Sequence, residues 1–445
     1  MVEEIKKDST VSVNLESALS QIEAKSSIAS EKWKKRSIYK VPQSTKALNQ
    51  KAYKPQVVSF GPYHHGAEQV KPMEEHKHRA FHNFIRNSGK PIMAYVEALF
   101  LVAEDLMEAY SYLESTGWSD KNKFLQLMIL DGCFMLEILR ANNAISAPQV
   151  MYGNYDVKDP IFSYHGKVYI VPHIQKDMLM LENQLPMLLL EKLIIVEGKV
   201  EEDSLPAYLN ETILKFFSPS LYIEKMQDKP LHLLDLYRTS QLQGDPPKRI
   251  RPPNPVNEPV HIDLSALQLH DAGIQFKASN THSFKDISFQ GGVLAIPTLT
   301  VDDATESILL NLVALERSHV GMGNEVTSYV FFMDNIIDSA KDVSLLRQDG
   351  IIHIALGSEK DVANVFNHLA ENVTPDPKGN LQDIHARINA YCNAKHHAWR
   401  AHLVHTYFRN PWAFLSLAAA IFLLVLTVVQ SFYGIYPYYH PGKSN

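Results

Sequence analysis

Apolar residues recur at helical spacing along most of the chain. This pattern predicts helices over residues 73–86, 91–116, 121–141, 173–197, 203–218, 230–241, 263–271, 303–318, 325–347 and 358–371. Segment 121–141 is apolar on nearly every side, which is typical of a buried helix. Pro186 lies in the middle of segment 173–197, where it predicts a kink or a break.

The pattern changes in two places. "GKVYIVP" (166–172) follows a turn and predicts a strand, and the stretch 273–303 predicts two or three short strands with a turn at Gly291-Gly292. The fold class that we predict is therefore mainly α, a helical soluble body with a small β element and one C-terminal transmembrane helix.

The C-terminal stretch is the most apolar part of the chain. Residues 411–442 contain no Asp, Glu, Lys or Arg, and 22 helical residues (412–433) would span about 33 Å, close to the thickness of a hydrocarbon core. Trp412, Tyr433 and Tyr436 would lie at the membrane interfaces. We therefore predict a single-pass anchor in the plasma membrane or an endomembrane.

Flanking charges predict the orientation of this anchor. Basic residues precede the span and only Lys443 follows it, so the soluble body is expected in the cytosol. The N-terminal residues lack the apolar stretch of a signal peptide, and the two cysteines cannot form a disulfide framework. The triplets beginning at Asn210 and Asn372 have the form of glycosylation acceptors and favour the opposite orientation.

Composition shifts predict the domain organisation. Six prolines fall within residues 243–259 and mark a loop or linker. The predicted parts are a flexible N-terminal segment (1–37), a helical N-terminal part (38–242), the proline-rich loop (243–259), a C-terminal part with the β element and a membrane-proximal helix (260–410), the transmembrane helix (411–433) and a short tail (434–445).

Charge and motifs argue against several classes of function. With 43 basic and 49 acidic residues, the chain has no overall positive field for a phosphate backbone, so we expect no nucleic-acid partner. The phosphate-loop, nucleophile-elbow, zinc-helix and dinucleotide motifs are missing from the sequence. We therefore expect no cofactor, and we favour a binding protein over an enzyme.

Acidic and amide residues inside apolar segments are the main candidate site. Asp131 and Glu137 lie in one such segment, and another contains Asp177, Glu182, Asn183 and Gln184. Buried carboxylates need partners, so these residues predict a polar network between helices, a pocket for a ligand or partner, or an acid–base pair.

Histidine gives a second, weaker candidate. His76, His78 and His82 lie on one predicted helix and suggest an open metal site, but solvent-facing histidines have the same pattern, and we predict no metal.

Several motifs resemble one known family. "IYKVP" (from 38), "AYKPQVVSFGPYHHG" (from 52), "MEEHKHRAF" (from 73), "DGCFMLEIL" (from 131), "DMLMLENQLP" (from 177), "GVLAIPTLTVDDATESILLNLVALE" (from 292) and the terminal "YFRNPWAFLSLAAAIFLLVLTVVQSFY" look like the plant domain-of-unknown-function 247 family. The second motif contains a turn made by Gly61, Pro62, Tyr63, His64 and His65. The resemblance implies a plant protein with a C-terminal anchor, and it supplies no catalytic residues. Some members are linked to grass self-incompatibility, and members have been proposed to face outward.

Three functions fit these observations. The first is a membrane-anchored, non-enzymatic recognition or signalling component that binds another protein. The alternative is an anchored hydrolase that uses the buried carboxylates. The third is an adaptor for lipid surfaces that uses the basic residues 32–36.

Overall fold

In a computed structural model of the chain, the residues described are 33, 35–218, 229–244, 264–355, 357–371, 381–393 and 411–439. Most of the proline-rich loop, the triplet at Asn372 and most of the N-terminal segment 1–37, including Lys32 and Lys34, lie outside them. The described chain is mainly helical with small sheets. It divides into two compact units: unit 1 is Met1–Gln243 with Asp303–Thr327, and unit 2 is Gly244–Asp302 with Ser328–Asn445.

The described residues of unit 1 form α and 3-10 helices and no β-strand. The helices are α2 (Gln43–Leu48), η1 (Gln50–Tyr53), α3 (Met73–Ser88), α4 (Ile92–Phe100), α5 (Ala103–Glu108), η2 (Leu113–Thr116), α6 (Lys121–Ala144), α7 (Tyr164–Tyr169), α8 (Val171–Met178), α9 (Met187–Glu197), η3 (Glu202–Ser204), α10 (Leu205–Phe217), α11 (Leu233–Gln241) and α13 (Thr305–Ser318).

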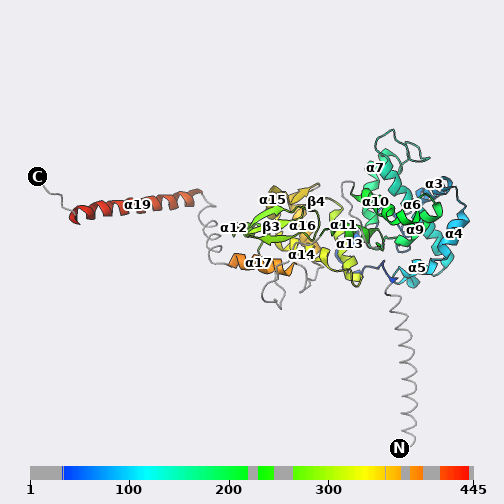
Figure 1. The fold of residues 1–445 in the computed structure, drawn as a ribbon, viewed down its shortest axis with the longest axis horizontal. Coiled ribbons are helices and arrows are strands. Elements are labelled where there is room, and N and C mark those ends of the chain that lie inside the picture. Colours follow the sequence, from blue (N-terminus) through cyan, green and yellow to red (C-terminus); the bar gives the residue numbers. More distant parts are fainter. Residues whose placement is uncertain are drawn as a thin grey trace, which may run out of the picture. The chain divides into compact units, whose positions relative to one another are not determined.

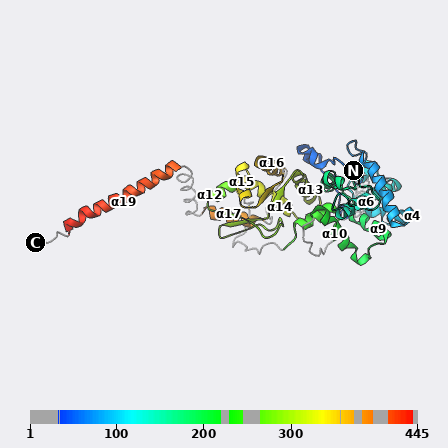
Figure 2. The ribbon, with the colours of Figure 1, turned by 90° about the horizontal axis from the view of Figure 1, so that it is seen from above.

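Helix α6 is the centre of unit 1 and contacts α3, α4, α9 and α10 (Figures 1 and 2). Its N-terminus is capped by Asp120, whose carboxylate accepts hydrogen bonds from the backbone N–H groups of Asn122 and Lys123. Gly132 lets α9 approach closely, since a Cβ there would lie 2.5 Å from a methyl carbon of Leu193. The prediction of a buried helix over 121–141 is confirmed, because residues on all sides of α6 are buried.

Unit 2 contains the β element. Strands β1 (Gln275–Ala278), β3 (Val293–Ile296) and β2 (Ser288–Gln290) form one sheet in that order, with β1 parallel and β2 antiparallel to β3. Strands β4 (Leu299–Val301) and β5 (Ile352–Ile354) form a parallel pair. The helices of unit 2 are α12 (Ala266–Asp271), most of α14 (Glu325–Ile336), α15 (Ala340–Gln348), α16 (Glu359–Ala370), α17 (Gln382–Asn393) and α19 (Pro411–Tyr439).

The turn between β2 and β3 confirms one prediction. Gly291 and Gly292 form the two-residue connection, with φ angles of +60° and +82°. Both angles lie in the left-handed region that a two-residue hairpin turn of this type requires and that glycine adopts without strain.

The strand predicted over 166–172 is wrong. This stretch belongs to α7 and α8 instead. The Ser163 hydroxyl accepts a hydrogen bond from the Gly166 N–H and caps α7, while Pro172 occupies the first turn of α8. These local signals for helix starts outweigh the strand propensity of the valines and the isoleucine.

Two long predicted helices are divided. Segment 91–116 forms α4, α5 and η2, and segment 325–347 forms α14 and α15. The second break lies at Ser339, which forms a capping box with Asp342 at the start of α15. Around Pro186, α8 ends at Met178 and α9 begins at Met187, as the predicted break requires.

The C-terminal prediction is not supported. α19 covers the apolar stretch, yet none of the helices in the described part of the chain is long and apolar enough to cross a membrane. Tyr433 is exposed on α19, and the side chains of Trp412 and Tyr436 lie outside the described set.

Candidate functional site

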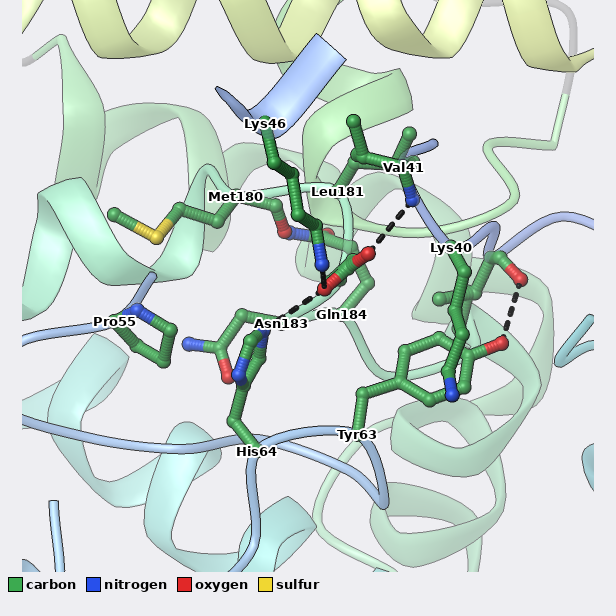
Figure 3. A network of polar contacts seen from close by, with 12 residues as sticks. Lys40, Val41, Lys46, Pro55, Tyr63, His64, Met180, Leu181, Asn183 and Gln184 are labelled. Atoms are coloured by element: carbon green, nitrogen blue, oxygen red, sulfur yellow. Dashed lines mark hydrogen bonds and ion pairs between the residues drawn. The ribbon is translucent and has the colours of Figure 1, made fainter. Parts of the chain in front are cut away.

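The polar residues of segment 177–184 contact residues 36–64 of unit 1, a stretch whose only helices are α2 and η1. Glu182 is 3 % exposed and illustrates the arrangement. Its Oε1 accepts a hydrogen bond of 2.7 Å from the Val41 N–H, and its Oε2 lies 2.6 Å from Lys46 Nζ and 3.2 Å from His64 Nε2 (Figure 3). Burial alone would raise the pKa of Glu182, but His64 and Lys46 together lower it below its ordinary value. Glu182 is therefore an anion that joins α2, the chain before it and the His64 turn.

Asp177 acts on the backbone of the same region. Its carboxylate accepts hydrogen bonds from three consecutive N–H groups, at 3.0 Å from Gln56, 2.7 Å from Val57 and 2.9 Å from Val58. Burial raises the pKa of Asp177, although the three backbone donors oppose that change. One fully buried side chain thus satisfies three backbone groups that have no helix or sheet partner.

Asn183 continues this pairing along the segment. Its Oδ1 accepts a hydrogen bond of 2.6 Å from the Phe60 N–H, and its Nδ2 donates to the carbonyl oxygens of Val58 at 3.0 Å and Asp177 at 2.9 Å. An amide side chain offers a donor and an acceptor, so Asn183 replaces a neighbouring strand at this point.

Asp131, which lies on α6, binds the backbone of Gly61, the residue that follows Phe60. Its Oδ2 accepts a hydrogen bond of 2.8 Å from the Gly61 N–H, and its Oδ1 lies 2.7 Å from Lys77 Nζ on α3. Lys77 also donates to the Ser59 carbonyl oxygen at 2.6 Å. Burial raises the pKa of Asp131, while the Lys77 ammonium opposes this. Both side chains are completely buried, so each charge depends on the other.

Gln184 connects this region to α11. Its Nε2 donates to the carbonyl oxygens of Met178 at 2.6 Å and Met180 at 2.8 Å, and its Oε1 accepts from the Leu234 N–H at 3.0 Å. Asp131, Asp177, Glu182, Asn183 and Gln184 are called the backbone-binding cluster below, since each of them binds main-chain groups.

Glu137 contacts different residues from those that the cluster contacts. Its carboxyl oxygens are 3.0 Å from the Tyr155 hydroxyl and 3.5 Å from the Tyr152 hydroxyl. Burial raises its pKa to about 7, and the hydrogen bond from Tyr155 opposes this rise. The sequence pattern that grouped Glu137 with Asp131 therefore combined residues that serve different neighbours.

The turn of Gly61, Pro62, Tyr63, His64 and His65 borders the cluster. Gly61 has a φ of +73°, and a Cβ there would lie 2.8 Å from the Tyr110 hydroxyl. The Tyr63 hydroxyl donates a hydrogen bond of 2.5 Å to the Ser111 carbonyl oxygen (Figure 3). His65 is exposed, and its ring contacts Trp118 edge-on at 5.3 Å.

The histidines of α3 do not form a metal centre in the described structure. His78 and His82 are exposed, and burial lowers the pKa of His76. Among the described residues, no group of three or more His, Cys, Asp or Glu side chains could hold a metal ion. Asn210, whose triplet resembles a glycosylation acceptor, is buried in α10.

Sequence reasoning missed the cations of the site. Lys77 is the clearest example, since it shares the buried face of α3 with Met73, Ala80 and Phe84. A lysine at helical spacing from three apolar residues is a readable signal of a buried cation. A second buried pair, Arg238 with Glu316, was missed too; the guanidinium lies 2.7 Å from the carboxylate.

Comparisons with known proteins place the sequence among plant proteins. The family model described as "Plant protein of unknown function" (DUF247) matches residues 38–426. The UPF0481 protein At3g47200 of Arabidopsis thaliana is 32 % identical over 438 residues, which cover 92 % of this chain and 88 % of that protein. The putative UPF0481 protein At3g02645 of the same plant is 31 % identical over 170 residues, or 38 % of this chain and 32 % of that protein. No solved structure matches the chain.

Proposed function

The chain belongs to the DUF247 family of plant proteins, whose function is unknown, and from that premise we propose that it is a non-enzymatic recognition component that binds another protein. The observation that carries this proposal is an exposed apolar surface on α4. Met93, Phe100 and the adjoining Leu101 are 61 %, 53 % and 85 % exposed, and their spacing places them on one side of the helix.

This surface, called the α4 face below, has the composition of an interface. Methionine and aromatic residues are enriched where proteins bind one another, and charged residues are depleted at the centre of such patches. Leaving three large apolar side chains in water has a free-energy cost that a protein partner would remove. Lys121, whose ammonium lies 5.2 Å from the Phe100 ring, supplies a polar rim.

The carboxylates of the cluster support the same proposal over the hydrolase alternative. Asp131, Asp177 and Glu182 are at most 3 % exposed, and each uses its oxygens on backbone N–H groups or a lysine. A catalytic acid and base need substrate within hydrogen-bond reach, and these oxygens are already occupied by the chain itself.

The test is capture of a partner by the full chain. The tagged chain is cross-linked in plant tissue and its partners are quantified beside Leu101→Asp and the matched control Val320→Asp, which changes a side chain that is 97 % exposed elsewhere in unit 1. We expect a protein captured by the wild type and by Val320→Asp to fall at least tenfold with Leu101→Asp, as for a central interface residue. Equal capture by all three chains would refute the α4 face.

Membrane attachment is part of the proposal and rests on the sequence alone. The uncharged stretch 411–442 would hold the chain at the plasma membrane or an endomembrane, with the body in the cytosol. Release of the intact chain from vesicles by carbonate would refute attachment. The resemblance also suggests a setting in self-incompatibility, which a loss-of-function plant with unchanged pollen rejection would exclude.

A further inference from the structure

A cavity of about 540 Å³ lies between α3, α4 and α6 of unit 1. Its inner surface is largely apolar and includes the nearly buried side chains of Leu127, Ile129 and Trp118 and the half-buried side chains of Phe81 and Val96. The volume falls within the range of small-molecule pockets, roughly 300–1,000 Å³, and such pockets combine apolar walls with a few polar groups.

The polar groups gather at the end of the cavity formed by the first turn of α6. Lys123 Nζ lies 4.8 Å from the centre of the Trp118 ring, and the His65 ring contacts the same tryptophan at 5.3 Å. Asn122 belongs to the same end of the lining. Among the residues that the structure describes, Lys123 has no carboxylate partner, so its charge is available to a ligand.

The acid in the lining, Glu74, is not paired with Lys123. Its Oε1 lies 2.8 Å from Lys77 Nζ, the ammonium that Asp131 also contacts at 2.7 Å, so this oxygen is engaged inside the unit. His78 adds a further imidazole to the rim. The cavity therefore combines an apolar interior with a rim on which Lys123 is a cation without a carboxylate partner among the described residues.

We infer that this cavity binds a small amphiphilic acid, a molecule with an apolar body and one carboxylate. The body lies against Leu127, Ile129 and Trp118, and the carboxylate lies beside Lys123 and His65. A neutral apolar molecule of the same shape gains the first set of contacts and lacks the second. This inference is independent of the protein partner proposed above, since it concerns the cavity between the helices and is measured on the purified chain.

The experiment measures binding of matched probes to the full chain. The probes are 2-naphthoate, its neutral counterpart 2-naphthylmethanol, and decanoate as an aliphatic acid. Equilibrium dialysis gives each Kd, and quenching of tryptophan fluorescence reports on Trp118, one of four tryptophans in the chain. We expect saturable binding of at least one of the two acids, quenching that Trp118→Phe removes, and a threefold to fivefold tighter Kd for 2-naphthoate than for the alcohol if the aromatic acid binds.

A pair of lysine variants distinguishes binding in the cavity from nonspecific electrostatic attraction to the surface. Lys123→Gln should weaken binding of the bound acid threefold to fivefold and leave the alcohol unchanged. The control is Lys121→Gln, two residues away on the same helix, whose ammonium pairs with Glu104 at 2.5 Å and does not line the cavity. This control should leave both affinities within twofold.

Three results would overturn the inference. They are the lack of saturable acid binding up to about 1 mM, equal losses with Lys121→Gln and Lys123→Gln, and unchanged binding after Val96→Phe, which fills the cavity. Folding of Val96→Phe is checked by circular dichroism. If that variant does not fold, Asn122→Asp replaces it, because a negative charge at the rim should weaken acid binding at least threefold and spare the alcohol.

Discussion

Residues 56–61 of unit 1 and strand β3 of unit 2 both bury apolar side chains, yet their backbones are held differently. Strand β3 receives its hydrogen bonds from the backbones of β1 and β2. The segment 56–61 has no regular structure and receives its bonds from the side chains of Asp177, Asn183 and Asp131. A buried backbone group needs a partner in either case.

This difference determines how each region responds to substitution. In the sheet, a side-chain change leaves the backbone ladder in place. In segment 56–61, loss of a single side chain removes the partners of several backbone groups together. The acids and amides that resemble catalytic residues in the sequence are, in this comparison, the substitute for a neighbouring strand.

The largest effect is expected for Asp177→Ala. The change leaves three N–H groups without an acceptor, of which only that of Val58 belongs to a buried residue, and should lower the free energy of unfolding by about 4 kcal/mol, since each lost partner costs roughly 1–3 kcal/mol and water recovers part of it. Urea unfolding of the full chain measures the loss. Asp203→Ala, an exposed acid of the same unit, should stay within about 0.5 kcal/mol of the wild type. A loss for Asp177→Ala no larger than that of the control would contradict the comparison.

Acid should loosen the N-terminal side of the same region through His232. This buried imidazole lies 3.0 Å from the Ser37 carbonyl oxygen through Nε2, and its Nδ1 accepts a hydrogen bond from the Asp235 N–H. These contacts require the neutral ring with a proton on Nε2. Burial lowers the pKa of His232 from 6.5 to about 4, against the opposing charge of Asp235.

The sign of the pH effect follows from these values. Between pH 6.5 and 4, His232 is protonated in the unfolded chain but stays neutral in the folded chain. The stability that is present above pH 6.5 is therefore lost as the pH falls, by up to about 3 kcal/mol. Glu137 changes stability in the opposite sense, because its folded pKa of about 7 lies above its ordinary value. The measurement is therefore a difference: His232→Asn, which keeps a helix-capping side chain, should show a smaller loss than the wild type across this window. Parallel curves would show that His232 does not contribute.

Gly61 in unit 1 and Gly292 in unit 2 test the comparison between the two regions, because an added Cβ would approach a tyrosine hydroxyl at both positions. A Cβ at Gly61 would lie 2.8 Å from the Tyr110 hydroxyl, and one at Gly292 would lie 2.6 Å from the Tyr391 hydroxyl, both with positive φ. Tyr110 is 3 % exposed and donates a hydrogen bond to the Gln184 carbonyl oxygen, whereas Tyr391 is only half-buried.

Gly61→Ala should therefore cost more than Gly292→Ala, with about 2–3 kcal/mol against about 1–2 kcal/mol in urea unfolding. Gly66→Ala is the control for backbone strain alone, because its φ is +81° and no atom lies within 4 Å of the added Cβ. It should cost about 1 kcal/mol. The reverse order for Gly61 and Gly292 would show that the packing around segment 56–61 is the more adaptable.

The sequence was sufficient for many of the regular elements of this fold and for the family. Helices α3, α6, α10, α13 and α16 and the hairpin at Gly291-Gly292 follow from periodicity and turn residues, and the family model confirms the resemblance seen in the motifs. Such features depend on neighbours within a few residues.

The rest depends on contacts between distant parts of the chain. Asp177 binds backbone about 120 residues away, and Lys77 meets Asp131 across 54 residues. Nothing in either local pattern states which backbone or which cation is the partner. The break at Ser339 was different, because the spacing of Ser339 and Asp342 carries a capping signal that the apolar pattern over 325–347 concealed.

The smallest effect is expected for Lys277→Met in β1. The backbone of Lys277 is aligned with that of Ala295 in β3, while its side chain is exposed. Methionine keeps the length of the side chain and removes only its charge, and substitutions at exposed strand positions change stability by a few tenths of a kcal/mol. Urea unfolding should therefore move by no more than about 0.5 kcal/mol, because the hydrogen bonds of β1 come from the main chain. A loss above about 1 kcal/mol would mean that side chains support this sheet as they support segment 56–61, and the contrast between the two regions would no longer hold.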